Sequence, residues 1–192
     1  MTRLTALLTF WLGCLFLLGG CATPRHVAGS VNGSTYTSAR GDFSVPFPVS
    51  PEVGGRILSD NAQSVTFHDN WGSRITFSSL PFEDSSSMMS VLRAQGPELA
   101  LREFAKRDYG DAIAVHYHPE ACGGAISFLF LKPVGPKTGV AAFVHGHRLY
   151  LVETDMLPGV QLLAQGDEKS QLDRDAWLEA RAVALAQSMT VK

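Results

Sequence analysis

The chain has 192 residues, and its 16 lysines and arginines against 18 aspartates and glutamates give a formal net charge of −2. It holds no run of basic residues, which argues against nucleic acid as a partner, because such proteins present a basic surface. Hydrophobic residues make up 45% of the sequence. That share is ordinary for a globular domain and excludes a chain that is disordered throughout.

The first twenty-one residues have the layout of a secretory leader. Arg3 supplies a positive start, and residues 4–18 are uncharged and mostly apolar. A helix that spans a bilayer needs about 20 apolar residues, so this run is short for a span. Small residues and a cysteine follow it, as they follow the apolar part of a signal peptide. An uncleaved single-span anchor is the alternative interpretation.

The stretch Leu18-Gly19-Gly20-Cys21 resembles the lipobox of bacterial lipoproteins. The resemblance implies that the Cys21 thiol receives a diacylglyceryl group, that the Gly20–Cys21 bond is cleaved, and that the new terminus is acylated. Two or more acyl chains hold a protein stably on a membrane, whereas one chain does so only marginally. Ala22 stands where inner-membrane retention in enterobacteria-like systems typically shows Asp. The resemblance therefore favours a place in the bacterial cell envelope, on the periplasmic side of the outer membrane.

These features divide the chain into three parts. Residues 1–20 are predicted to be a signal peptide, and residues 21–41, rich in Ser, Thr and Gly, a flexible tether. Residues 42–192 have the length of a single domain. Cys14 would leave with the leader and Cys21 would carry lipid, so Cys122 would remain alone, without an intramolecular disulfide. Cys122 is either a small buried hydrophobe or a loose thiol.

The first part of the domain has the pattern of β-structure. Residues 43–48 alternate apolar with small or proline residues, and proline confines them to an edge strand. Residues 63–69 and 74–80 alternate apolar and polar side chains, as strands with one buried face do. The turn residues Asp69-Asn70-Trp71-Gly72 lie between them. We therefore expect a hairpin here.

The later part mixes helices and strands. Residues 85–107 have a helical period, which Gly96-Pro97 interrupts. Strands are predicted at 112–118, 125–131, 140–144 and 149–152, the last two joined by a tight turn at Gly146. A closing helix is predicted over 173–188. Strands that are apolar on both faces must be covered on both, so the sequence predicts an α+β fold, with an antiparallel β-sheet sandwiched between helices (α/β/α).

This order of elements resembles that of the PsbP-like α/β/α domains. The resemblance covers residues 43–192, from the opening Phe43-Ser44-Val45-Pro46-Phe47-Pro48 to the closing Gln187-Ser188-Met189-Thr190-Val191. It rests on the order of elements and on no diagnostic motif. Members of that fold mostly serve as assembly factors or docking modules, so the resemblance implies a protein that is not an enzyme.

Histidines offer the clearest candidate for a metal site. His116 and His118 lie two residues apart on a predicted strand and so share a face, and imidazole is a common ligand of zinc or copper. His145 and His147 are candidates to approach them, and Glu120 or Cys122 to complete a ligand set. Against this, Pro119 breaks the strand, and the second histidine pair flanks a turn glycine, where side chains usually meet water. We therefore expect no metal and no other cofactor.

Motifs of catalysis are also missing from the sequence. It contains no Gly-x-Ser-x-Gly elbow and no His-Glu-x-x-His motif, phosphate-binding loop or dinucleotide fingerprint. No catalytic residue can be named from spacing. We expect a lipid-anchored, non-catalytic binding or assembly module, with the membrane bound through Cys21 and an envelope protein as partner. The alternatives are a metal-binding envelope protein that uses His116 and His118, and an enzyme without a recognisable motif.

Overall fold

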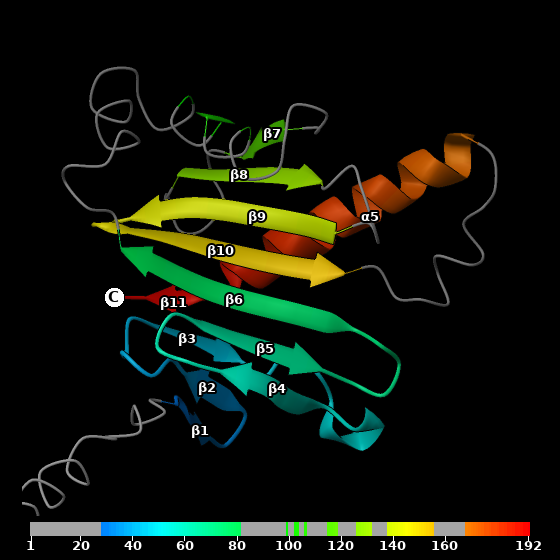
Figure 1. The fold of residues 1–192 in the computed structure, drawn as a ribbon. Helices are drawn as coiled ribbons and strands as arrows, with labels where there is room; N and C mark the ends of the chain where they lie inside the picture. Colours follow the sequence, from blue (N-terminus) through cyan, green and yellow to red (C-terminus); the bar gives the residue numbers. More distant parts are fainter. Residues whose placement is uncertain are drawn as a thin grey trace, which may run out of the picture.

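The computed structural model describes residues 28–81, 115–118, 126–131, 138–155 and 168–192, together with the single positions Leu99, Arg102, Glu103 and Lys106. Two antiparallel sheets and one long helix, α5 (Glu168–Gln187), account for most of these residues (Figure 1). The predicted leader and its cleavage and lipidation residues, Gly20 and Cys21, lie outside the described ranges. None of the helices within those ranges is long and apolar enough to cross a bilayer.

The larger sheet has the strand order β4-β5-β6-β10-β9-β8-β7, and all of its neighbouring strands are antiparallel. In that order the strands are β4 (Arg56–Asp60), β5 (Ser64–His68), β6 (Arg74–Pro81), β10 (Arg148–Asp155), β9 (Thr138–His145), β8 (Ile126–Leu131) and β7 (Val115–His118). The predicted β5–β6 hairpin is confirmed. The tight β9–β10 turn is confirmed as well, with Gly146 at φ 57°.

The smaller sheet has the order β1-β2-β3-β11. Its strands are β1 (Ser30–Asn32), β2 (Thr35–Thr37), β3 (Phe43–Pro46) and β11 (Thr190–Val191), and the short helix η1 (Pro51–Val53) follows β3 in the chain. A flexible tether reaching residue 41 is therefore wrong for residues 30–37, which form a hairpin of the folded domain. The hairpin folds because Tyr36, 1% exposed, packs edge-on against Phe67, their ring centroids 5.5 Å apart.

One face of the larger sheet carries the main hydrophobic core. The smaller sheet covers it at the β4–β6 end through Tyr36 and Phe43, and α5 covers it at the β8–β10 end. The cluster is continuous between the two covers. Leu178, Ala182 and Ala186 of α5 are buried at intervals of four residues, which is the helical spacing predicted for a docked face.

Helix and sheet approach most closely at Gly139 of β9. A Cβ atom built at Gly139 would lie 2.9 Å from the carbonyl oxygen of Leu178. Glycine therefore allows the backbone of α5 to rest almost directly on the strand. A side chain of any size at residue 139 would require the helix to shift.

The predicted two-sided cover of the sheet is seen on one side, where α5 lies. The helix expected over 85–107 falls largely outside the described residues, and its four described positions are helical. On the second face of the sheet Val140, Leu149 and Leu151 are buried. The α+β class with an antiparallel sheet thus holds, and the full helical sandwich stays a prediction.

Candidate functional site

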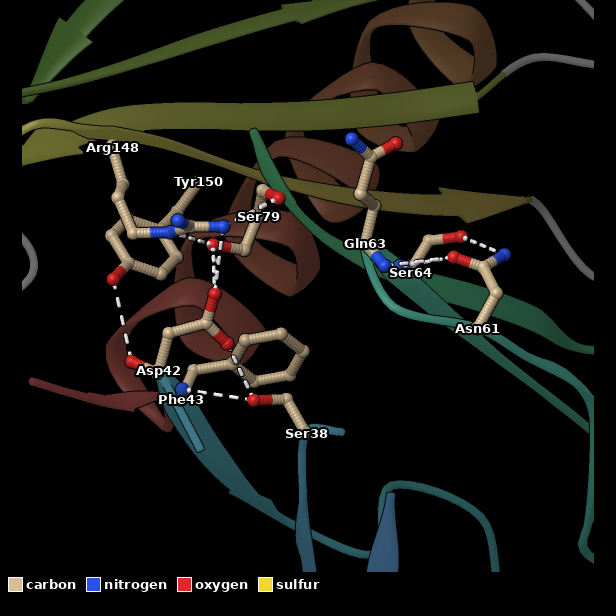
Figure 2. A network of polar contacts seen from close by, with 9 residues as sticks. All are labelled: Ser38, Asp42, Phe43, Asn61, Gln63, Ser64, Ser79, Arg148 and Tyr150. Carbon is tan, nitrogen blue, oxygen red and sulfur yellow. Dashed lines mark hydrogen bonds and ion pairs between the residues drawn. The ribbon is translucent and has the colours of Figure 1, made fainter. Parts of the chain in front are cut away.

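Asp42 is the centre of a polar network between the two sheets (Figure 2). Its Oδ2 atom accepts a hydrogen bond of 2.8 Å from the Ser79 hydroxyl and forms an ion pair of 2.8 Å with Nη2 of Arg148. Its Oδ1 atom accepts from the Ser38 hydroxyl. The Tyr150 hydroxyl donates to the Asp42 carbonyl oxygen over 3.3 Å. The network thereby connects the β2–β3 turn to β6 and β10.

Electrostatics fit a structural role for this network. Burial alone would raise the pKa of Asp42, but the hydrogen bonds from Ser38 and Ser79 and the charge of Arg148 outweigh it and lower the pKa. Burial, together with the nearby Asp42 charge, raises the pKa of Tyr150. Asp42 is thus held as a carboxylate, and both of its oxygens are occupied by protein donors. This arrangement fastens the smaller sheet to the larger one.

A second group, which we call the histidine–glutamate cluster, comprises His116, His118 and Glu179. His116 Nδ1 lies 2.8 Å from one carboxylate oxygen of Glu179, and His118 Nε2 lies 2.8 Å from the other. The predicted common face of the two histidines is confirmed, because both rings reach the same carboxylate of α5. The three side chains are 57%, 36% and 21% exposed, in that order.

The other predicted candidates do not join this cluster. His145 and His147 are exposed at the β9–β10 turn. Glu120 and Cys122 lie outside the described residues. Within the described part of the chain, no group of three or more His, Cys, Asp or Glu side chains is arranged to hold a metal ion. Sequence reasoning missed Glu179, because it lies more than sixty residues from either histidine.

The solvent-facing side of α5 is unusual in composition. Among residues 174–187, whose side chains the structure describes, the exposed positions are Ala176, Trp177, Ala180, Ala184 and Gln187. Trp177 is 41% exposed, and the guanidinium carbon of Arg181 lies 5.1 Å from the centre of its ring. Burial lowers the pKa of Arg181, against an opposing effect of the Asp69 charge. Over residues 174–187 the exposed positions of the helix are thus uncharged, and a partly buried cation supports Trp177.

A rigid turn between β5 and β6 presents a second tryptophan to solvent. The Asp69 Oδ1 atom accepts hydrogen bonds of 2.9 Å from the backbone N–H groups of Trp71 and Ser73. The N–H of Asn70 donates to the carbonyl oxygen of Val53 over 3.0 Å, which ties the turn to η1. Trp71 is 69% exposed. The sequence predicted the turn, but no pattern in it foretold that the indole would point outward.

No family model matches the sequence, and no curated protein matches it either. Among solved structures, the chain is similar to the cyanobacterial PsbP protein CyanoP of Synechocystis, with 11% identity and a TM-score of 0.49, over 92% of this chain and 99% of that one. It is also similar to the Ran-binding protein Mog1p of Saccharomyces cerevisiae, with 10% identity and a TM-score of 0.46, over 84% and 96% of the two chains. A likeness of this size carries no functional argument.

Proposed function

We propose that the protein is a lipid-anchored lipoprotein of the bacterial cell envelope that binds another envelope protein and catalyses no reaction itself. The main support for a lipid anchor is the stretch Leu18-Gly19-Gly20-Cys21, which directly follows an uncharged apolar run. The thiol of Cys21 is the lipid acceptor in this proposal. The acyl chains hold the domain at the membrane surface, with the outer membrane favoured.

The outer face of α5 supports a protein partner. Surface helices usually turn charged and polar residues outward, whereas α5 exposes three alanines, one glutamine and Trp177 over residues 174–187, where its side chains are described. Tryptophan and arginine are the residue types enriched where protein interfaces concentrate their binding energy. Trp177 is supported by Arg181 at 5.1 Å. We assign the partner's docking site to this face.

The non-catalytic part of the proposal is supported by how the polar side chains are used. Asp42 has both carboxylate oxygens occupied by Ser38, Ser79 and Arg148. Glu179 likewise has one histidine on each oxygen. These carboxylates bind neighbouring elements together, which is a structural use of charged groups.

The anchor is tested by metabolic labelling with a fatty acid. The unaltered chain should incorporate the label, and Cys21→Ser should remain unprocessed and unlabelled. A Cys21→Ser protein that still carried the fatty acid would contradict the lipid-anchor assignment.

The partner site is tested by co-purification of the lipidated protein from membranes. Trp177→Ala should weaken capture of the partner by about tenfold or more, the size of effect seen at dominant interface residues. Val31→Ala is the matched control, because Val31 is 50% exposed on β1, a strand of the smaller sheet. Equal capture by both variants would place the partner elsewhere on the surface.

A further inference from the structure

Two exposed arginines flank His68 on the face of the larger sheet that α5 does not cover. Arg56 of β4 pairs in register with His68 of β5, which in turn pairs with Arg74 of β6. Residues that pair across strands project from the same face of a sheet. Arg56 donates to the side chain of Asn70 over 3.1 Å. Within the described residues, neither arginine forms an ion pair, so their charges are free to meet an external anion.

Two exposed apolar side chains lie close to Arg56 in the chain or through its contact with Asn70, Leu58 being at a β-bulge of β4. Trp71, 69% exposed, is in the turn that joins β5 to β6, and Leu58, 51% exposed, is two residues after Arg56 on the edge strand β4. We call Arg56, Leu58, Trp71 and Arg74 the arginine–tryptophan patch. The hydrogen bonds of Asp69 fix the turn beforehand, so little ordering is needed when Trp71 binds a surface.

Asp69, in the turn that holds Trp71, is the nearest carboxylate among the described residues; it is buried, and its Oδ1 atom accepts from the N–H groups of Trp71 and Ser73. Glu52 of η1 is exposed, and it precedes β4 in the chain. Glu153 of β10 faces Thr76 of β6 and has its own polar partner. Asp155 accepts a hydrogen bond of 2.8 Å from Thr138. The patch therefore combines cationic and apolar groups, which is the combination that suits an anionic lipid surface.

The path of the chain leads from the proposed lipid anchor to the same strand. The N–H of Gly29 donates to Oδ2 of Asp60 over 3.0 Å, and Asp60 is the last residue of β4. Cys21 and Gly29 are eight residues apart, a length that spans at most about 29 Å when fully extended. In Figure 1, β1 and β4 lie at the same end of the molecule. A lipid on Cys21 would therefore keep the patch within reach of the bilayer.

We propose that the arginine–tryptophan patch docks on an anionic phospholipid surface and so orients the domain on its own membrane; this rests on the lipid anchor of the proposed function. The guanidinium groups of Arg56 and Arg74 bind lipid phosphates, for which their fork of N–H donors is suited. The Trp71 indole lies at the headgroup level, as amphipathic rings do. The helix α5 packs on β8, β9 and β10, and its outer side is assigned to the protein partner.

Tryptophan fluorescence of the full lipidated chain in vesicles tests the proposal. Trp11 leaves with the leader, so replacing Trp177 by Phe leaves Trp71 as the reporter, and in the matched chain replacing Trp71 by Phe leaves Trp177. The vesicles contain phosphatidylglycerol and brominated acyl chains, which quench nearby indoles. The Trp71 reporter should shift to the blue and lose intensity, and the Trp177 reporter should do neither.

The charge requirement is tested in the Trp71 reporter. Replacing both Arg56 and Arg74 by Gln should weaken docking by about five-fold for each arginine, which is the roughly 1 kcal/mol that a cation gains at an anionic membrane surface. Arg40→Gln removes the same charge from the exposed β2–β3 turn and should leave quenching unchanged. Vesicles of phosphatidylcholine alone should quench Trp71 less than those with phosphatidylglycerol.

The outcomes distinguish failure of the membrane-docking proposal from failure of the lipid-anchor proposal. Chains that float with the vesicles while Trp71 stays unquenched would overturn membrane docking and leave the lipid anchor intact. Chains that do not float with the vesicles would overturn the anchor. Shielding of Trp71 in native membranes but not in pure lipid would overturn the lipid surface in favour of a protein at this patch.

Discussion

Leu178→Ala tests whether α5 holds the domain together. The Leu178 side chain is fully buried at 0% exposure, and substitutions of this kind destabilise proteins by about 2–5 kcal/mol, depending on how far the site collapses. Collapse is restricted here, because the Leu178 carbonyl oxygen would lie only 2.9 Å from a Cβ at residue 139. The backbone of α5 cannot move much closer to β9, so the cavity stays open. We therefore expect a loss near the upper end, about 3–5 kcal/mol.

The assay is urea unfolding of the full chain, followed by the change in circular dichroism. The free energy of unfolding should fall in Leu178→Ala, with a slope against urea like that of the unaltered protein. Leu185→Ala should cost less, because Leu185 is only partly buried. Leu58→Ala is the matched control; Leu58 is 51% exposed, so its effect should stay within about 0.5 kcal/mol. A midpoint for Leu178→Ala equal to that of the control would refute the docking of α5.

Three further changes follow from the described contacts. The hydrogen bonds and the ion pair that lower the pKa of Asp42 stabilise the fold above pH 3.8, the ordinary pKa of this carboxyl group. Asp42→Asn should therefore reduce the free energy of unfolding by about 1.5–3 kcal/mol at neutral pH. The urea midpoints of the variant and the unaltered protein should move closer together as the pH falls below 3.8. A difference that persisted unchanged into acid would show that the charge is not the cause. Gly139→Ala should cost about 1–3 kcal/mol through crowding against α5, and a melting temperature equal to that of the unaltered protein would show that the helix shifts freely. Chelation with EDTA should leave the melting curve unchanged; a stoichiometric metal by elemental analysis together with a large fall in melting temperature would instead make the histidine–glutamate cluster a metal site.

Strong local patterns predicted the structure well. The period-two alternation of residues 63–80 and the helical spacing after Asp173 each reflect one buried face, so the strands β5 and β6 and the docked side of α5 could be predicted. The glycine at the β9–β10 turn was predicted for the same kind of reason, since a tight turn needs positive φ.

Contacts between residues far apart in the chain could not be predicted, because they produce no periodic pattern in the local sequence. The β1–β2 hairpin looked like a tether, because only Tyr36 among its residues is a large buried side chain. The strand β11 has two residues, too few for any period, and it is a strand only because β3 accepts it as a partner. Glu179 could not be linked to the histidines for the same reason: the fold, and not the local sequence, brings β7 and α5 together.

The pairing of β11 with β3 has a consequence for the order of folding. Val191 lies opposite Phe43 in the ladder, and the N–H of Lys192 donates to the carbonyl oxygen of Asp42. The smaller sheet therefore cannot be completed until residue 191 has been synthesised, and contacts of such long sequence separation make folding slow. For a chain exported through a membrane in the unfolded state, this slow step would keep the smaller sheet incomplete during export. The chain could therefore pass through a translocation channel before β11 pairs with β3.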